Sequence, residues 1–244
     1  MPCLWEAVAG RAAPRWPRHS HHDAAIGLTW QLKDDLPAGR HVYYGKILRG
    51  RPCLVALDVF PAFYALIRGR QRARDYRMEY AGGRLTQSAR RIMDALAAEH
   101  PQYTRGLRAS CFMLGARQTR EFERAMAELQ QGLWIVKTEE RYEPSFSYRW
   151  DLLEAWLPDV VAAGRRLTRA AAAQALVERY LRAAVFTRPA VLRRLFGLSE
   201  REAAASAAVL TKRGTVVETA VAGWTGRWLV DASAVRSKKG RRAP

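Results

Sequence analysis

The stretch Glu121-Phe-Glu-Arg-Ala-Met-Ala-Glu-Leu-Gln-Gln-Gly-Leu-Trp-Ile-Val-Lys-Thr138 decides the fold that this sequence predicts. Four of its apolar residues recur at the spacing of one helix face: Phe122, Ala125, Met126 and Leu129. Gly132 follows the last of them, at a position where a left-handed residue commonly ends a helix. The apolar run 133–136 then predicts a buried strand. A helix that passes through a short turn into a strand is typical of the second half of a winged helix-turn-helix.

The same succession of elements returns further along the chain, which indicates an internal repeat. Helix, turn and strand are predicted at 202–210, 211–214 and 215–219. Leu210 aligns with Leu129, and Gly214 aligns with Gly132 after one extra turn residue. We therefore predict a mainly α protein with small β-hairpins (α+β), in which tandem winged helix-turn-helix domains are preceded by an α/β segment.

The first predicted winged helix covers residues 86–164. Thr86 is expected to cap its first helix, because threonine oxygens accept hydrogen bonds from the free N–H groups at a helix start. The inward residues of that helix are Ile92, Met93 and Leu96. Thr104 is expected to cap a short second helix. The hairpin strands are predicted at 133–138 and 145–150, and a linking helix is predicted at 152–163.

The second predicted winged helix covers residues 165–235. Its first helix is expected to bury Leu176, Val177, Tyr180 and Leu181. Pro189 lies in the first turn of the second helix, where a missing N–H is tolerated. The run Ser199-Glu-Arg-Glu202 predicts a capping box for the third helix. Hairpin strands are predicted at 215–219 and 227–230, and a disordered basic tail at 236–244.

The N-terminal part shows weaker patterns. Residues 1–41 predict an irregular basic segment, because prolines interrupt them and their tryptophans have no periodic partner. Residues 42–85 predict a strand-turn-strand with Gly50 in the turn, followed by a helix. The cluster His19-Ser-His21-His22-Asp23 matches part of a metal-ligand string but lacks the final histidine, so we expect a solvated loop and no metal site.

The composition indicates an anionic partner. The chain of 244 residues has 41 Lys and Arg against 23 Asp and Glu, which gives a formal net charge of +18. Such an excess attracts phosphate backbones, although a bias toward Arg and Ala in a GC-rich coding sequence is an alternative interpretation. No run reaches the ~20 apolar residues of a membrane helix. The three cysteines are far apart and predict neither disulfides nor a zinc site.

From these features we expect double-stranded DNA as the partner and a cytoplasmic, nucleoid-associated protein. We expect no membrane partner and no small-molecule cofactor, and the sequence does not indicate an oligomeric state.

Basic residues outside the apolar helix faces are the candidate DNA contacts. A helix-turn-helix places one helix in the major groove, which would bring Arg117, Arg120 and Arg124 to phosphates or base edges. The second such helix is mostly alanine over 203–208, which favours backbone contacts over sequence reading. The arginine-rich connector 68–77 is either a solvated linker or a phosphate-contacting edge. The full candidate set is Lys46, Arg49, Arg51, Arg105, Arg117, Arg120, Arg124, Arg201, Lys212, Arg213 and Arg227.

The runs 27–37 (GLTWQLKDDLP) and 42–52 (VYYGKILRGRP), followed by tandem winged helices, resemble the AlkZ-related proteins. These are relatives of the AlkZ/YcaQ-type winged-helix DNA glycosylases, which excise bulky alkylated or crosslinked bases. The resemblance covers residues 2–235. It implies tandem winged helices around duplex DNA and a catalytic Gln-x-Gln or Gln-x-Asp motif near the start. Here Gln31-Leu32-Lys33 has lysine at the second motif position, and the first winged helix of the family is missing or truncated.

Three functions are compatible with these features. The leading one is double-stranded DNA binding by tandem winged helices, related to base-excision repair of alkylated or crosslinked DNA. The second is an active DNA glycosylase for bulky alkylated bases. In that case Asp34 and Asp35 are the candidate catalytic carboxylates, because a carboxylate stabilises a developing oxocarbenium charge. The third is a transcriptional regulator or protein-interaction module.

Overall fold

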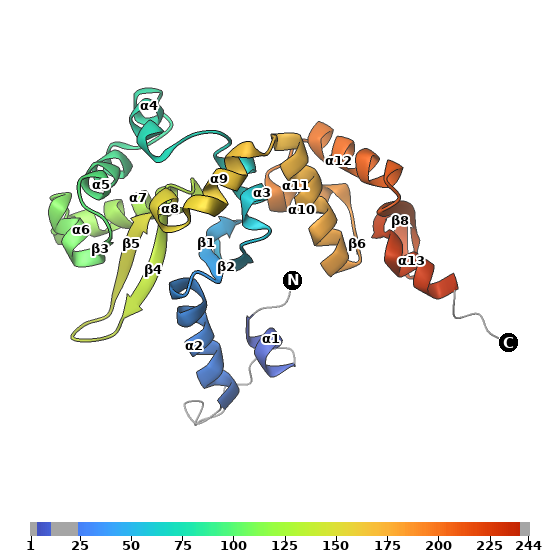
Figure 1. Cartoon of the computed structure of the whole chain (residues 1–244), viewed down its shortest axis with the longest axis horizontal. Helices are drawn as coiled ribbons and strands as arrows, with labels where there is room; N and C mark the ends of the chain where they lie inside the picture. Colours follow the sequence, from blue (N-terminus) through green and yellow to red (C-terminus); the bar gives the residue numbers. More distant parts are fainter. Residues whose placement is uncertain (1–3, 11–23, 240–244) are drawn as a thin grey trace. The chain divides into compact units, whose positions relative to one another are not determined.

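The structure, a computed structural model, describes residues 4–10 and 24–239 (Figure 1). The chain divides into two compact units, one of Met1–Leu57 with Arg72–Pro158 and one of Asp58–Gln71 with Asp159–Pro244. Helices predominate in the described residues, and the strands form three small antiparallel sheets. The predicted fold class, mainly α with small hairpins, is confirmed. No helix among the described residues is long and apolar enough to cross a membrane.

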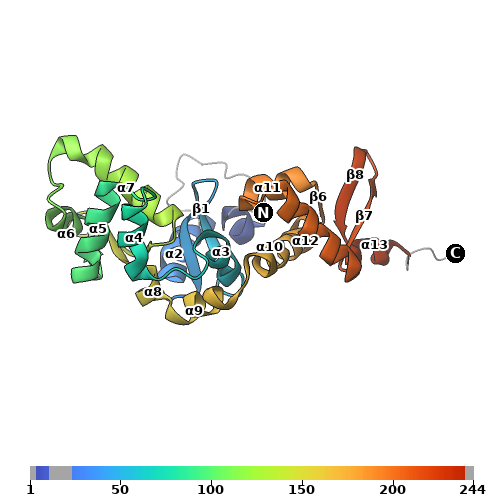
Figure 2. The same cartoon turned by 90° about the horizontal axis from the view of Figure 1, so that it is seen from above.

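The first unit contains what we call the first module, residues 86–152. Its elements are α5 (Gln87–Ala98), β3 (Gln102–Tyr103), α6 (Thr104–Ser110), the 3-10 helix η3 (Ala116–Gln118), α7 (Thr119–Gln131), β4 (Ile135–Arg141) and β5 (Ser147–Leu152). The sheet order is β3-β5-β4, so the returning hairpin strand is central. Figure 2 shows α5, α6 and α7 grouped together, and their buried side chains form one core with those of the hairpin.

The second unit contains the second module, residues 168–231, with the same order of elements. These are α10 (Arg169–Ala184), β6 (Phe186–Thr187), α11 (Pro189–Phe196), α12 (Glu200–Lys212), β7 (Val216–Val221) and β8 (Trp224–Asp231). Its sheet order is β6-β8-β7, which again makes the returning strand central. Two modules of one topology are therefore present, as the internal repeat predicts.

The predicted inward faces of the helices are correct. On α7 the buried residues are Phe122, Ala125, Met126 and Leu129, and on α5 they include Ile92, Met93 and Leu96. On α10, Leu176, Val177 and Leu181 are buried, whereas Tyr180 is half-buried. The apolar run at the start of the hairpin, 133–136, is fully buried. Helical periodicity identified these faces because each helix has one side against the core.

Most of the predicted helix caps are also present. The hydroxyl oxygens of Thr86 and Ser199 accept hydrogen bonds from backbone N–H groups three residues on, and Ser199 forms a capping box with Glu202. The prediction for Thr104 is wrong, because this residue is inside α6 and Tyr103 occupies the cap position. The Thr104 hydroxyl instead donates to the Tyr148 carbonyl oxygen at 3.1 Å. It therefore ties α6 to the hairpin.

The turn that ends α7 differs from the prediction. Gly132 has φ −77°, which is not left-handed, and the left-handed residue is Leu133 with φ 55°. In the second module Gly214 is left-handed, with φ 71°. Leu133 and Gly214 each lie four residues after the equivalent leucines, Leu129 and Leu210, so no extra turn residue separates the repeats. Glycine is needed at position 132 for a different reason, because a Cβ there would lie 2.7 Å from a ring carbon of Trp134.

The remaining elements of the first unit are α1 (Leu4–Ala9), α2 (Ala24–Ala38), β1 (Val42–Leu48), β2 (Arg51–Ala56), the 3-10 helix η2 (Ala73–Asp75), α4 (Tyr76–Ala81) and α8 (Leu153–Trp156). The prediction of an irregular N-terminal segment is wrong for α2. The β1–β2 hairpin and the positive φ of Gly50 agree with the prediction. The histidine cluster at 19–23 lies outside the described residues.

The second unit also contains α3 (Phe60–Ile67), most of α9 (Pro158–Arg166) and α13 (Ala232–Lys239). The predicted linking helix is two helices, because α8 ends at Trp156 and α9 begins at Pro158. The predicted tail is helical as far as Lys239. The predicted 42–85 segment is divided, since residues 58–71 pack with the second unit, where α3 contacts α10.

Candidate nucleic-acid interface

Three exposed arginines follow one another on η3 and the outer face of α7: Arg117 on η3, and Arg120 and Arg124 on α7. Within the described residues none of the three makes an ion pair or a hydrogen bond through its side chain. Two nearby acids are occupied, since Glu121 accepts a hydrogen bond from Ser88 and Glu128 accepts two from Thr86, whereas Glu123, between Arg120 and Arg124 in the sequence, is exposed. The helix therefore uses two of its carboxylates to fix itself against α5 and leaves its guanidinium groups available to an anion.

The turn between β1 and β2 adjoins the C-terminal end of this face. A Cβ added at Gly50 would lie 3.6 Å from the side-chain nitrogen of Gln131, and β1 packs on α7. At 100° per residue, Gln131 shares the face of Arg120 and Arg124 within about 40°. The exposed Arg49 and Arg51 flank Gly50. Two basic segments that are distant in sequence thus form one strip on the first unit.

Two other predicted contacts belong to the first unit. Lys46, on β1, is half-buried. Arg105, in the first turn of α6, is exposed and without a side-chain partner among the described residues. Arg108, on the same helix, is different because its guanidinium is used internally, with its Nε donating to the Met113 carbonyl oxygen at 2.9 Å.

The second module presents fewer free charges. Arg201, Lys212 and Arg213 are exposed and have no side-chain partner within the described residues. Arg227 is exposed but pairs with Glu218 across the hairpin at 3.1 Å. Exposed ion pairs of this kind are weak. The Arg227 guanidinium can therefore exchange Glu218 for a phosphate at little cost. Between Arg201 and Lys212 the outer face of α12 shows Ala204, Ala205 and Ala208.

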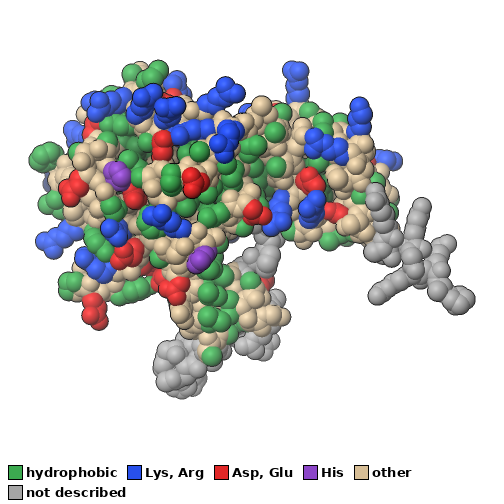
Figure 3. Space-filling view, in the orientation of Figure 1, with side chains coloured by type: hydrophobic (Ala, Val, Ile, Leu, Met, Phe, Trp, Pro, Cys, Tyr) green, Lys and Arg blue, Asp and Glu red, His purple; other side chains and the backbone are tan. Residues whose placement is uncertain are grey.

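Lys and Arg side chains also gather over the α4 region of the first unit (Figure 3). Many of these are paired with acids, for example Arg84 with Glu79 at 2.6 Å and Arg90 with Asp94 at 3.3 Å. Arg68, in the arginine-rich connector, is buried. The other connector arginines are exposed, but Arg74 and Arg77 lie 3.9 and 3.8 Å from Asp75 and Asp94. The connector therefore offers fewer unpaired guanidinium groups than η3 and α7.

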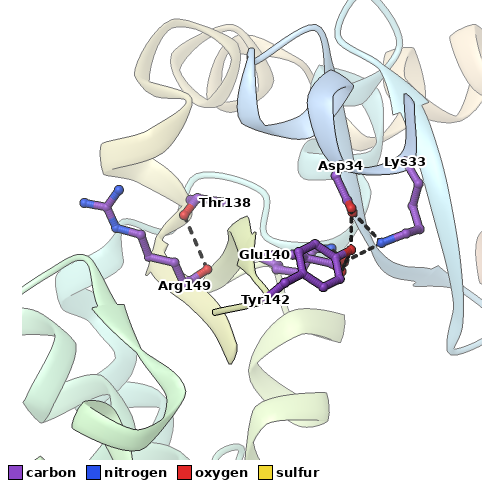
Figure 4. Close-up of polar contacts among 7 residues, drawn as sticks. Lys33, Asp34, Thr138, Glu140, Tyr142 and Arg149 are labelled. Carbon is purple, nitrogen blue, oxygen red and sulfur yellow. Dashed lines mark hydrogen bonds and ion pairs between the residues drawn. The ribbon is translucent and has the colours of Figure 1, made fainter. Parts of the chain in front are cut away.

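The candidate catalytic residues lie on α2, and α2 packs on β4 and β1. Figure 4 shows Lys33 and Asp34 directed toward Glu140 and Tyr142 of the first hairpin. The Lys33 Nζ lies 2.8 Å from a Glu140 carboxylate oxygen and also contacts Asp34. The Tyr142 hydroxyl donates to Asp34 at 2.6 Å. Lys137 completes the group, which we call the α2–β4 cluster, by pairing with Glu140.

Opposite charges balance within this cluster and set its protonation. Burial raises the pKa of Glu140, but hydrogen bonds from Lys137 and Lys33 outweigh burial and hold that pKa below its usual value. Burial lowers the pKa of Lys137, and its bond to Glu140 offsets only part of that effect. The bond to Asp34 raises the pKa of the Tyr142 hydroxyl well above its usual range. Two ammonium groups and two carboxylates thus neutralise one another.

This arrangement separates the two candidate carboxylates. Asp34 is held by Lys33 and Tyr142, whereas Asp35 is exposed and has no side-chain partner among the described residues. Gln31, the first residue of the motif-like run, is also exposed and lies one helical turn before Asp35. Sequence reasoning did not identify Lys137, Glu140 or Tyr142. Lys137 and Glu140 lie in β4 and Tyr142 directly follows it, and this run of polar residues carries no signal that α2 packs against it.

These observations define a class of protein. It is a mainly helical chain with two modules, each made of three helices and a hairpin. It also has a basic helix face and a charged cluster on an N-terminal helix. The chain belongs to the AlkZ-related family, whose sequence profile matches residues 3–197.

A solved structure with a similar fold is the Streptomyces sahachiroi DNA glycosylase AlkZ, with a TM-score of 0.60 and 14% sequence identity. The match covers 99% of this chain and 62% of that chain. No curated protein sequence matches this chain.

Proposed function

We propose that this protein binds double-stranded DNA without strong sequence preference, through the strip formed by the outer face of α7 and the β1–β2 turn. The observation that carries the proposal is the set of three exposed, unpaired arginines on η3 and α7 beside Arg49 and Arg51. Unpaired guanidinium groups bind phosphates without first breaking an internal ion pair. The modules would then act as winged helices, with α7 as the helix that approaches the duplex.

Membership of the AlkZ-related family and the similarity to a DNA glycosylase support a role connected with DNA repair of alkylated or crosslinked bases. The net charge of +18 supports a polyanionic partner. A cytoplasmic, nucleoid-associated location follows from this function. A regulator that reads a defined sequence is disfavoured, because α12 offers mostly alanine at its outer face.

The test is fluorescence anisotropy with two unrelated duplexes of the same length. We expect both to bind with similar affinity. The double variant Arg120→Ala/Arg124→Ala should bind both about 10-fold or more weakly at low salt, because two phosphate contacts are lost. Arg84→Ala/Arg90→Ala is the charge-matched control, since both arginines are exposed in the same unit but paired, with Glu79 and Asp94. An equal loss in the control would show that net charge alone determines binding, which would refute the assignment to α7.

Base excision is a second candidate, favoured by the exposure of Gln31 and Asp35 on one side of α2. Asp34 is the weaker candidate because its carboxylate is engaged by Lys33 and Tyr142. The assay measures release of free base from a duplex that contains an N7-alkylguanine. Release that is lost in Asp35→Asn and retained in Asp34→Asn would support this function. Tight binding without release by the wild type would exclude it for that lesion.

A further inference from the structure

The turn between α6 and α7 exposes two large apolar side chains. Phe112 is 86% exposed and Leu114 is 58% exposed, whereas Met113 between them is 1% exposed. The buried Met113 belongs to the core of the first module. Met113 therefore anchors the centre of the turn in the core, while the side chains of Phe112 and Leu114 are exposed to solvent. Exposed apolar groups that a fold holds in place commonly mark a contact surface.

Side-chain hydrogen bonds hold the backbone of this turn. The Arg108 guanidinium donates to the carbonyl oxygens of Met113, Leu114 and Gly115 and to the Thr119 hydroxyl, at 2.9 to 3.3 Å. The Gln118 side chain donates to the Phe112 carbonyl oxygen and accepts from the Gly115 N–H, each at 3.1 Å. An exposed side chain on a backbone fixed in this way loses less conformational freedom on binding than one on a free loop.

Phe112 also has a strained backbone conformation. Its φ is 56°, in the left-handed region that residues other than glycine seldom adopt. Strain of this kind persists where the surrounding structure fixes it, and it concentrates at functional positions. Here the strained residue is also the more exposed of the two apolar side chains.

Arginines precede and follow the turn in the chain, and Arg91, Asp94 and Glu99 line a hollow together with Phe112. Arg105 precedes it on α6, and Arg117 and Arg120 follow it on η3 and α7. All three are exposed and without side-chain partners in the part of the chain that the structure describes. Free guanidinium groups on both sides of an apolar pair fit a partner that is anionic at its edge and apolar inside, which describes a DNA duplex with its phosphates and stacked bases.

We propose that Phe112 and Leu114 form a wedge that inserts into the base stack of duplex DNA bound by α7. This inference rests on the proposed function and adds a distortion of the duplex to it. Apolar wedges of phenylalanine or leucine partially unstack base steps while basic residues hold the backbone. A base next to an unstacked step costs less free energy to expose. Damaged bases also leave the stack more easily than normal ones, so the wedge would favour their exposure.

The test uses duplexes that contain 2-aminopurine at successive positions, because its fluorescence increases when the base is unstacked. The full-length wild type at saturation should raise the signal at one or a few positions. Phe112→Ala/Leu114→Ala should lose most of that rise and bind about 5-fold more weakly, as expected when base–aromatic stacking is lost. Phe112→Trp should retain the signal. Met78→Ala is the matched control, since Met78 is 71% exposed on α4 of the same unit.

Three outcomes would overturn the wedge. Wild-type binding without any rise in fluorescence would show that the stack is intact. A full rise in the double variant, with an unchanged melting temperature, would assign the unstacking to other residues and leave the apolar pair as a protein-binding surface. Failure of the wild type to bind any duplex at low salt would refute the proposed function together with the wedge, and is distinguished from the first outcome by anisotropy.

Discussion

The two modules have the same inner faces and different outer faces. Leu129 and Leu210 are fully buried, and their carbonyl oxygens accept equivalent bonds from Trp134 and Thr215 at 2.9 and 3.1 Å. With the helices aligned in this way, Arg120 corresponds to Arg201. Arg124, however, corresponds to an alanine, Ala205. The repeat therefore preserves the residues that pack the fold, whereas the charge available to a partner is concentrated on one copy.

The largest expected effect tests whether the inner faces are equivalent. Leu129→Ala and Leu210→Ala should each lower the free energy of unfolding by about 2–5 kcal/mol, because each removes a fully buried side chain and leaves a cavity. The measurement is chemical denaturation of the full chain, with the exposed Gln131→Ala as control. A loss below about 1 kcal/mol at only one of the two leucines would break the equivalence.

A smaller effect tests the alignment of the two turns. Gly214 has φ 71°, so Gly214→Ala should lower the free energy of unfolding by about 1–2 kcal/mol. Gly106→Ala in α6 is the control. Its added Cβ would meet no atom closer than 3.9 Å, and alanine favours helix by about 0.5–1 kcal/mol. If Gly214→Ala proves neutral, the left-handed turn shared by the two modules is wrongly assigned.

An exchange of outer-face residues tests the difference between the modules. Arg124→Ala should weaken binding to duplex DNA about 3- to 10-fold at low salt, because a phosphate contact is removed. Ala205→Arg places a guanidinium at the equivalent exposed position of α12 and should strengthen binding by a similar or smaller factor. Anisotropy titrations at fixed low salt measure both. If neither variant changes the affinity for duplex DNA, these two helix faces do not contact DNA.

The smallest expected effect concerns the cap of α12. Hydrogen bonds from Arg169 and Ser199 lower the pKa of Glu202 from 4.5 to about 2. A carboxylate with a depressed folded-state pKa stabilises the fold above its unfolded pKa, and this contribution is lost as the pH falls from 4.5 toward 2. Glu202→Gln should therefore flatten part of the acid side of the stability profile. Because this carboxylate is exposed, the change will be slight, and identical profiles would show that the pairing has no net effect.

Local patterns predicted much of the fold. The burial of Phe122, Met126 and Leu129 follows from helical spacing, and the Ser199 capping box follows from two residues three positions apart. Both depend only on neighbours within one element. The sequence also placed Gly50 correctly in its turn, because a positive φ favours glycine there.

Tertiary contacts explain what the sequence could not predict. The helix α2 was missed because only Ile26 and Pro37 are buried on it, so it has no regular apolar stripe. Its contacts with the hairpin are polar, through Lys33 and Asp34. Asp34 and Tyr142 are 108 residues apart in the chain, and no spacing rule links them. The left-handed conformation of Leu133 was missed because a buried leucine gives no turn signal.

The same limit applies to the candidate interface. The arginines of α7 could be identified from their positions outside the apolar face. The adjacency of Gly50 and Gln131, which extends the strip to Arg49 and Arg51, depends on how β1 packs on α7. The exposure of Phe112 and Leu114 likewise depends on the bonds that Arg108 makes across the turn.

The most direct test of the account is the salt dependence of duplex binding by the wild type and by Arg120→Ala/Arg124→Ala. The logarithm of affinity should fall linearly with the logarithm of salt concentration, with a slope of about −0.9 for each phosphate contacted. If α7 carries two of these contacts, the double variant should have a slope shallower by about 1.8, whereas the charge-matched Arg84→Ala/Arg90→Ala should leave it nearly unchanged. A wild type that does not bind at low salt, or a slope that is the same in the double variant, would contradict the claim that α7 holds the duplex.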